Sequence, residues 1–505
     1  MDTIPIEERS LADLQVDLNA GHVTSQRLVA EYAERIQRID RRGPSLASVI
    51  ELNPDALKIA RALDAERKAN GPRGPLHGIP ILIKDNIATR DRMQTTAGSF
   101  ALEGSQPPED AFVVQRLRAA GAVILGKTNL SEWANIRSSQ SSSGWSARGG
   151  LTRNPYALDR SASGSSSGSA VAVAASLCAA AVGTETDGSI LSPASVCGIV
   201  GLKPTVGLIS RSGIVPIAHS QDTAGPMARN VRDCALLLAA LTGTDASDSA
   251  MQGSDAHHRR DYTAGLDAGA LKGARLGVAR QYFGFHEPTD TAFVAVLTAL
   301  RTAGAALVDP ITLPAIETIG DAELTVLLYE LKADLNAYLA RLGPDAPART
   351  LAAVIAFNQR NAATEMKWFG QDLFVKAQAK ASLTEDEYLK ARALCLRVAR
   401  DEGIDAVMKR HALDALIAPT GGPAWRSDLV LGDHFVGGGS TTPSAVAGTP
   451  SITVPAGFVH GLPVGLSFFA GAWSEARLLS LAYAFEQVTK ARRPPRYLDT
   501  VDATA

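Results

Sequence analysis

The stretch that decides the fold opens with Ser163-Gly164-Ser165-Ser166-Ser167-Gly168-Ser169, continues as AVAVAASLCAAAV over 170–182, and closes with Gly183-Thr184-Glu185-Thr186-Asp187-Gly188-Ser189. A flexible Gly/Ser linker would be bordered by polar segments and would have no packing demand. Here two turns rich in serine and glycine are joined by an apolar small-residue segment, predicted to be a buried helix. The arrangement predicts that two serines are brought to one place on a rigid support.

A lysine after an apolar run is the next informative feature. The segment GIPILIKDN over 78–86 places Lys84 directly after Ile81-Leu82-Ile83, a run typical of a central strand. Adjacent side chains of a strand point to opposite faces, so Asp85 is expected to point away from Lys84. Burial lowers the pKa of a lysine from its usual value of about 10.4, and a lysine acts as a base only when neutral.

These motifs, in this order, resemble the amidase signature family, whose pattern reads GGSSGGS, then a buried helix, then GTDTGGSIRIPA. The likeness continues through GAVILGKTNLSEWA (121–134), RNPY (153–156), GIVGLKPTVGLIS (198–210), SQDTAGPMAR (220–229), AVAGTPSITVPAG (445–457) and GLPVGL (461–466). It is weakest between about 245 and 410. The resemblance implies an α/β fold with a large twisted mixed β-sheet, helices on both faces and a helical insertion lobe.

The resemblance also implies a catalytic unit. Ser189 would be the nucleophile that forms an acyl-enzyme, Lys84 the base, and Ser165 the relay that passes the proton between them. In the family, the middle serine follows a cis peptide bond. The oxyanion hole would consist of the backbone N–H groups of Thr186, Asp187, Gly188 and Ser189.

Two positions depart from the common family pattern. Asp187 stands where glycine is usual, although a backbone donor does not require glycine and aspartate tolerates unusual dihedral angles. Leu191 and Ser192 stand where an Arg-Ile pair is usual. In relatives that act on acidic substrates this arginine can bind a carboxylate, so its loss argues against a small dicarboxylic half-amide.

One branch of the family, the bacterial peptide amidases, is especially similar. The segments that carry this likeness are SEWAN, GWSARGG, TETDGSI, LLYELKADL, AVIAFNQ and WFGQDL. The similarity predicts an enzyme that converts the C-terminal carboxamide of a peptide to free acid and ammonia. Amidases of aryl, aliphatic or fatty acid amides and the glutamine-hydrolysing subunit of a tRNA amidotransferase remain alternatives.

Three further alternatives fit the sequence less well. Gly164 to Gly168 matches GxSxG, the nucleophile elbow of α/β-hydrolase esterases, with Ser166 at its centre. That motif needs a preceding strand, whereas NPYALDRSAS is polar, and none of the available histidines (His411, His434, His460) has a recognisable context. A phosphate-binding loop would need GK[ST], which is absent here. A non-catalytic binding protein is disfavoured because all three catalytic side chains are present.

Composition excludes several other classes. The 52 acidic and 50 basic residues nearly cancel and the basic ones are scattered, which argues against nucleic-acid and anionic membrane partners. The four cysteines (Cys178, Cys197, Cys234, Cys395) are expected to be buried, reduced thiols, and neither they nor the histidines form a metal-binding pattern. No cofactor, metal or transmembrane segment is predicted, and a monomer is favoured. The segment after Met1 lacks a signal-peptide pattern, which favours a cytoplasmic enzyme unless a leader was removed.

Strand and helix patterns alternate along the chain, which is typical of an α/β sheet covered by helices. Ser10 and Thr24-Ser25 are predicted helix caps. Strands are predicted at Ile79–Ile83, Val123–Leu125, Val206–Ile209 and Leu416–Ala418, and helices at 111–120, 170–182, 231–242 and 291–304. We predict one domain over 1–505, with a core over about 70–245 and 411–490 and a helix-rich insertion over about 316–412. Trp133, Trp145 and Trp425 fit equally well as pocket walls or as loop anchors.

Overall fold

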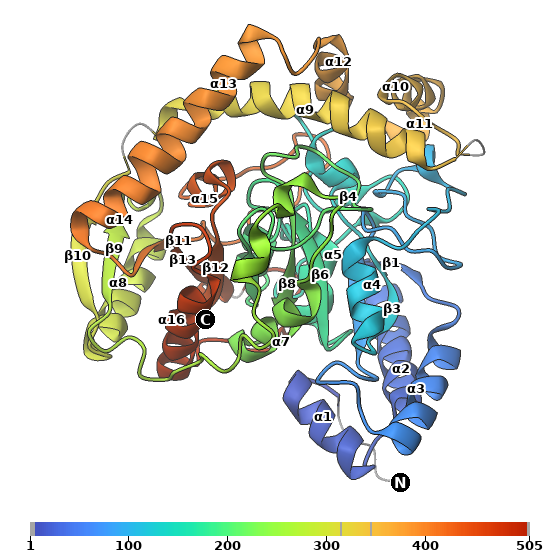
Figure 1. Ribbon diagram of the computed structural model, residues 1–505, viewed down its shortest axis with the longest axis horizontal. Coiled ribbons are helices and arrows are strands. Elements are labelled where there is room, and N and C mark those ends of the chain that lie inside the picture. The colour runs from blue at the N-terminus through green and yellow to red at the C-terminus, as the bar shows by residue number, and fades with distance from the viewer. Residues whose placement is uncertain (1–5, 314–315, 344–345, 502–505) are drawn as a thin grey trace.

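One mixed sheet of eleven strands runs through the molecule, as the computed structural model shows for residues 6–313, 316–343 and 346–501 (Figure 1). Its strand order is β1-β3-β2-β6-β8-β7-β12-β13-β11-β9-β10. The strands are β1 (Val49–Leu52), β2 (Pro80–Lys84), β3 (Val123–Thr128), β6 (Ala180–Glu185), β7 (Val200–Lys203), β8 (Thr223–Ala228), β9 (Arg275–Ala279), β10 (Ala306–Ile311), β11 (Ala415–Pro419), β12 (Ser451–Val459) and β13 (Leu462–Phe469). A separate two-stranded ribbon pairs β4 (Trp145–Ser146) with β5 (Gly150–Leu151).

Helices flank this sheet, so the predicted α/β class with a mixed sheet is confirmed. In the body of the molecule, α5 packs on β6, α7 on β8, α6 on β13, and α8 and α16 on β12. The helices are α1 (Leu11–Ala20), α2 (Ser25–Arg35), α3 (Ala56–Asn70), α4 (Phe112–Ala119), α5 (Ser167–Ala174), α6 (Leu191–Val196), α7 (Val231–Leu241), α8 (Glu287–Thr302), α9 (Gly320–Arg341), α10 (Leu351–Arg360), α11 (Ala362–Glu365), α12 (Asp372–Ala379), α13 (Asp386–Leu396), α14 (Asp405–His411), α15 (Thr442–Ala447) and α16 (Glu475–Thr489). Two π-helical segments, Ile36–Arg41 and Arg397–Ile404, continue α2 and α13.

The predicted helix caps are confirmed. The Ser10 side chain accepts a hydrogen bond from the backbone N–H of Asp13, and the Thr24 side chain accepts one from that of Arg27. Each bond satisfies one of the backbone donors that the first turn of a helix leaves without a partner. These two caps fix where α1 and α2 begin.

Two sequence predictions of secondary structure are wrong. The helix expected over 170–182 ends at Ala174, and Ala180 already belongs to strand β6, because Ser176 takes a positive φ of 53° that breaks the helix. The strand expected over Val206–Ile209 is a tight turn, in which Gly207 has a φ of 91°. Both stretches are apolar and short, and periodicity alone separates helix, strand and buried turn poorly in such runs.

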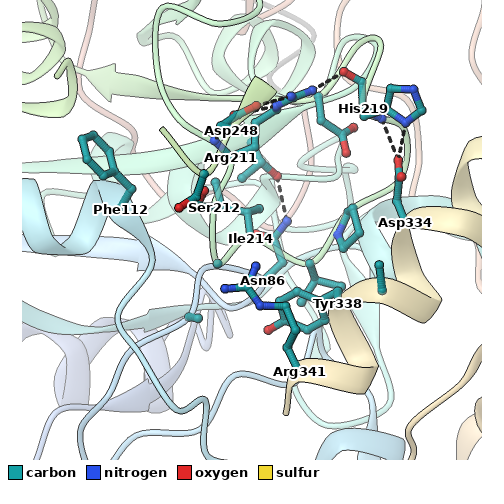
Figure 2. Close-up of a pocket in the computed structure, with 18 of the residues that line it drawn as sticks. Asn86, Phe112, Arg211, Ser212, Ile214, His219, Asp248, Asp334, Tyr338 and Arg341 are labelled. Carbon is teal, nitrogen blue, oxygen red and sulfur yellow. Dashed lines mark hydrogen bonds and ion pairs between the residues drawn. The ribbon is translucent and has the colours of Figure 1, made fainter. Parts of the chain in front are cut away.

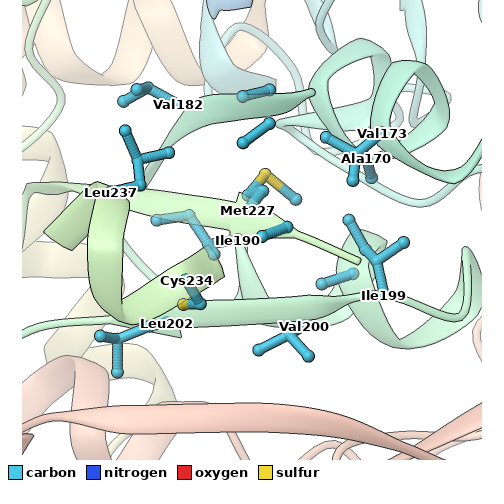
Figure 3. Close-up of a cluster of buried hydrophobic side chains, with 14 of the residues drawn as sticks. Ala170, Val173, Val182, Ile190, Ile199, Val200, Leu202, Met227, Cys234 and Leu237 are labelled. Carbon is cyan, nitrogen blue, oxygen red and sulfur yellow. The ribbon is translucent and has the colours of Figure 1, made fainter. Parts of the chain in front are cut away.

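The main hydrophobic core lies between the central strands and α5, α6 and α7 (Figure 3). Val182 of β6, Met227 of β8, Leu202 of β7, and Ala170 and Val173 of α5 all belong to this core, and all five are fully buried. The small side chains of α5 let this helix approach the sheet closely. The serine-rich turn before α5 is thereby held against the strand that leads to Ser189.

The helices from α9 to α14 form an arc along one side of the molecule (Figure 1). Two further hydrophobic clusters join these helices to the rest of the protein, and one of them contains Leu335 and Leu339 of α9, Phe374 of α12 and Trp133. This arc occupies the expected helix-rich segment, while the division into one domain with an insertion stays a prediction. Among the described residues, no helix is long and apolar enough to cross a membrane. All four cysteines are free and buried, as predicted.

Candidate active site

Lys84 ends strand β2, which lies inside the sheet between β3 and β6, and is fully buried. Its Nζ lies 2.7 Å from Ser165 Oγ, 2.8 Å from Thr184 Oγ1 and 3.2 Å from the carbonyl oxygen of Thr184. Thr184 comes from the neighbouring strand β6, which pairs in parallel with β2. The structure therefore brings together the lysine and the first serine, 81 positions apart in the sequence.

Burial lowers the pKa of Lys84 to about 7, because the surrounding protein solvates an ammonium poorly. The charges of Glu185 and Asp222 act in the opposite direction and raise this pKa. Asp85 makes no contact with Lys84; its Oδ2 accepts hydrogen bonds from the hydroxyl and backbone N–H of Thr96. The prediction that Asp85 points away is confirmed, and a substantial fraction of Lys84 is neutral near pH 7.

Ser165 is held rigidly. It is fully buried, it follows a cis peptide bond from Gly164, and its carbonyl oxygen accepts a hydrogen bond of 3.1 Å from the backbone N–H of Ser131. A Cβ at position 164 would lie 2.1 Å from Ser131 Oγ, so Ser131 would have to move from the position in which it accepts the backbone N–H of Gly144. The glycine is therefore needed for the close approach that places Ser165 against Lys84.

Ser189 lies just after β6 and keeps 8% of its surface exposed, whereas Ser165 keeps none. Its carbonyl oxygen accepts a hydrogen bond of 3.0 Å from the backbone N–H of Ser166, which fixes the two serine-bearing turns to each other. Within the described chain, no hydrogen bond joins Ser189 Oγ to Ser165 Oγ. Of the two serines, Ser189 is the one that a substrate can reach.

The loop Thr186–Ser189 is anchored at several points. The Thr186 hydroxyl donates to Asp222 Oδ1 at 2.6 Å, and Glu185 Oε2 accepts the backbone N–H groups of Ile190 and Leu191 at 2.7 and 2.9 Å. Gly188 has a φ of 76°, a conformation that glycine adopts without strain. These bonds fix the path of the loop whose backbone N–H groups are expected from the family resemblance to form the oxyanion hole.

Asp187 has its own anchor. The hydroxyls of Thr441 and Thr442 each donate to one of its carboxylate oxygens at 2.6 Å. This ties the loop to the start of α15, more than 250 positions away. The aspartate that departs from the family pattern thus tethers the loop to another part of the chain.

The serine of the esterase alternative is placed differently. Ser166 is fully buried, and its Oγ donates to the carbonyl oxygen of Thr184 at 2.9 Å and accepts that residue's backbone N–H at 3.2 Å. Its hydroxyl is committed to holding two backbone groups. This arrangement argues against Ser166 as a nucleophile.

The tryptophans singled out in the sequence mostly act as anchors. Trp133 is buried and packs edge-on against Phe374, and Trp145 is buried and packs edge-on against Phe369. Phe374 belongs to α12 and Phe369 to the connection between α11 and α12, so these contacts fasten the arc to the core. Trp425 packs against Phe435 in a loop and donates to Asp433 at 3.1 Å.

One cluster of metal-ligand side chains was missed by sequence reasoning. Ligand atoms of His219, Glu330 and Asp334 lie within 4.8 Å of one another. Each is already engaged: His219 Nδ1 lies 2.8 Å from Asp334 Oδ2, and Tyr388 donates to Glu330 at 2.7 Å. The i, i+4 spacing of Glu330 and Asp334 on one helix was the only sequence signal, and it is common on solvated helices.

A cavity of about 510 Å³ adjoins the site (Figure 2). Thr184, Glu185 and Thr186 line it, together with Asn86, but Lys84, Ser165 and Ser189 do not. Asn86 donates to Thr184 Oγ1 at 3.0 Å, and Lys84 Nζ donates to the same oxygen at 2.8 Å, so the Thr184 hydroxyl links the cavity lining to the lysine.

This α/β fold, with a serine loop beside a buried lysine–serine pair, defines a hydrolase that acts on amide bonds. Comparison with known proteins agrees at the level of the family. The family model described as Amidase matches residues 27–479, and the chain belongs to that family.

Several relatives and solved structures are similar over nearly the whole chain. The crystal structure of peptide amidase PAM with the competitive inhibitor chymostatin matches with a TM-score of 0.95 and 53% identity, covering 98% of this chain and 100% of that one. The native peptide amidase from Stenotrophomonas maltophilia matches with a TM-score of 0.93 and 52% identity, covering 98% and 99%. An Arabidopsis thaliana protein named "Probable amidase" is 42% identical, covering 98% and 93%. A glutamyl-tRNA(Gln) amidotransferase subunit from Ralstonia nicotianae is 38% identical, covering 96% and 99%.

Proposed function

We propose that this amidase hydrolyses the C-terminal carboxamide of peptides to a free acid and ammonia, with Ser189, Ser165 and Lys84 as its catalytic unit. The observation that carries the catalytic part is the 2.7 Å contact between buried Lys84 Nζ and Ser165 Oγ. The peptide part is supported by the similarity to two peptide amidase structures at more than half identical residues.

In the acylation step, Ser189 Oγ attacks the carboxamide carbonyl carbon. Its proton passes to Ser165 Oγ, and the proton of Ser165 passes to the neutral amine of Lys84. The carbonyl oxygen becomes an oxyanion, which accepts hydrogen bonds from the backbone N–H groups of the Thr186–Ser189 loop. When the intermediate collapses, the proton returns from Lys84 through Ser165 to the leaving nitrogen, and ammonia departs.

In the deacylation step, water replaces ammonia at the same position. One proton of the water travels through Ser165 to Lys84 as the water oxygen bonds to the acyl carbon. Collapse of the second intermediate breaks the bond to Ser189 Oγ, which regains a proton, and releases the acid. Lys84 is neutral again, so the cycle closes without a net gain or loss of protons by the enzyme.

The environment of Leu191 supports a neutral substrate. Leu191 is fully buried and its backbone N–H is bound to Glu185, so this position offers no cation beside Ser189. A free carboxylate next to the scissile bond would lose its hydration without gaining a partner there. An amidated peptide is therefore expected to be a better substrate than glutamine or a half-amide of a dicarboxylic acid.

The test is to incubate the enzyme with an amidated pentapeptide and to follow both mass and ammonia. The expected product differs from the substrate only by –OH in place of –NH2. Ser189→Ala should lower the rate by at least about 10³-fold. Ser195→Ala is the matched control, because this serine is also buried, lies on the adjoining helix α6, and has a hydroxyl without a hydrogen-bond partner.

Other outcomes would redirect the assignment. Internal fragments of the peptide would indicate a peptidase. Rapid hydrolysis of glutamine or of a fatty acid amide, with the amidated peptide untouched, would contradict the peptide assignment while keeping the amidase chemistry. Full activity of Ser189→Ala would overturn the catalytic unit itself.

A further inference from the structure

The cavity of about 510 Å³ next to Thr184 has a polar end that the proposed reaction does not use. Figure 2 shows Asn86, Tyr338 and Arg341 grouped there, with Asn86 coming from the segment after β2 and the other two from the last turns of α9. Arg211, His219 and Asp334 lie toward the opposite end in the same view. The volume is in the range that small-molecule sites occupy.

Two polar atoms at this end are buried without a hydrogen-bond partner. They are Oδ1 of Asn86, a residue only 2% exposed, and the hydroxyl oxygen of Tyr338. A buried polar group without a partner is costly, and such groups in folded proteins usually meet a ligand or an ordered water. Burial raises the pKa of Tyr338, so its hydroxyl remains protonated and can donate a hydrogen bond.

Arg341 supplies an available positive charge beside these atoms. Within the described ranges, its guanidinium has no ion pair or hydrogen bond. The other cationic side chains of the lining are already paired, Arg211 with Asp248 and His219 with Asp334. An anionic group entering the cavity would therefore meet its uncommitted donors at Arg341 and Tyr338.

Five apolar side chains, Phe112, Ile214, Val215, Ile217 and Leu342, form part of the cavity walls. The lining also carries carboxylates, most of which are bound within the protein: Asp110 pairs with Arg118, Asp222 accepts from Thr186, and Asp245 accepts from Ser210. A ligand that matches the whole cavity combines a carboxylate for Arg341 and Tyr338, an N–H for Asn86 Oδ1 and an apolar body for these walls. A short peptide with a free C-terminal carboxylate, or an N-acylated amino acid, carries all three features within a few bonds of one another.

We propose that this cavity is a second ligand site, separate from the acyl-transfer site, for a small N-acylated apolar amino acid or short peptide that ends in a free carboxylate. The acid that the proposed reaction releases belongs to the same chemical class. This connection between the ligand and the reaction product rests on the proposed function, whereas the site itself does not. Because Asn86 contacts the same Thr184 hydroxyl as Lys84, the ligand would lie one side chain away from the catalytic base.

Calorimetric titration of N-acetyl-L-leucine into the Ser189→Ala enzyme tests the site without turnover. Saturable binding is expected. Arg341→Met, which keeps the aliphatic stem and removes the charge, should weaken it about tenfold, and Tyr338→Phe by a few-fold. Arg360→Met is the matched control, because this arginine is also exposed, lies at the end of α10 and does not line the cavity. The methyl ester of the same ligand should bind the Ser189→Ala enzyme as weakly as the acid binds that enzyme carrying Arg341→Met.

A second titration separates this cavity from the acyl site. The Ser189→Ala enzyme is first saturated with an amidated pentapeptide, and N-acetyl-L-leucine should then bind with unchanged affinity. Displacement by the peptide would place the acid in the substrate site and overturn the proposal, as would absence of binding or equal binding to Arg341→Met. If the enzyme fails to hydrolyse amidated peptides but the Arg341-dependent binding is found, only the proposed function is wrong.

Discussion

The pH dependence of turnover tests the assigned base directly. Burial lowers the pKa of Lys84 to about 7, and the neutral amine is the active form. The value of kcat/KM should therefore rise with pH and level off above about pH 7. One unit below the pKa, roughly one lysine in eleven is neutral, so the rate at pH 6 should be about a tenth of its plateau.

Glu185→Gln sharpens this test, because the charge of Glu185 raises the pKa of Lys84. The amide oxygen of glutamine can still accept the N–H groups of Ile190 and Leu191, so the loop should keep its path. The acid limb of the profile is then expected to move to lower pH, with the plateau kept within about tenfold. Glu475→Gln is the matched control, since this buried carboxylate also accepts a backbone N–H, that of Thr205 at 2.7 Å, and is not among the charges that act on Lys84.

The assay is continuous detection of ammonia from roughly pH 5 to pH 9, with thermal unfolding recorded at each pH to exclude loss of folded enzyme. A profile that is flat through pH 7 would refute the role of Lys84 as the base. An acid limb that stays in place in Glu185→Gln, or moves equally in Glu475→Gln, would refute the electrostatic account of its pKa.

Four further changes have definite expected outcomes. Ser165→Ala should lower kcat by about 10³-fold. The double variant Ser165→Ala/Ser189→Ala should be little less active than Ser189→Ala alone, because the same catalytic unit is lost in either case, and measurement of kcat for the three variants tests this. Asp187→Gly removes the hydrogen bonds from the two threonine hydroxyls that hold the Thr186–Ser189 loop. The value of kcat and the affinity for a peptide aldehyde should therefore fall together by about tenfold while KM stays constant. A change in KM alone would contradict this role of Asp187. Exhaustive chelation should leave activity intact, and the activity of His219→Asn should stay within about tenfold of that of the unaltered enzyme. A loss of activity on chelation that one added metal ion restores would reveal a functional ion. Lys84→Met should abolish turnover yet unfold at higher urea concentration at pH 6, because it removes a buried ammonium.

Sequence patterns predicted those features in which particular residue types occur at a characteristic spacing along the chain. The family resemblance carried by the motifs around Lys84, Ser165 and Ser189 predicted that the fold brings these residues together, and the structure places Lys84 in contact with Ser165. The helix caps at Ser10 and Thr24 were also readable, because a cap depends on residues three positions apart.

Other features depend on contacts that no local pattern encodes. Asp222 meets Thr186 across 36 positions, and Thr441 meets Asp187 across 254. The end of α5 at Ala174 was missed because alanine-rich segments fit a helix as well as a buried strand. The polar end of the cavity was missed for a related reason, since Asn86 and Tyr338 become neighbours only after α9 lies over the core.

The stability of Lys84→Met follows from the same burial that activates the base. The difference between the ordinary lysine pKa of 10.5 and about 7 in the folded protein corresponds to about 5 kcal/mol. Because the folded-state pKa is lowered, this penalty on folding is complete below pH 7 and disappears as pH rises toward 10.5. Methionine removes the penalty but also loses three hydrogen bonds worth about 1 kcal/mol each.

The balance should therefore depend on pH. Lys84→Met is expected to be more stable than the parent by about 2 kcal/mol at pH 6 and no more stable at pH 9, as measured by urea unfolding. Lys127→Met is the matched control: Lys127 is equally buried with a pKa lowered to about 8, but it lies 4.0 Å from buried Asp85. Removing Lys127 leaves that carboxylate without its nearest lysine, so the gain should be smaller or reversed. A Lys84→Met enzyme that is less stable than the parent at pH 6 would mean that the lysine is held by interactions stronger than its loss of hydration.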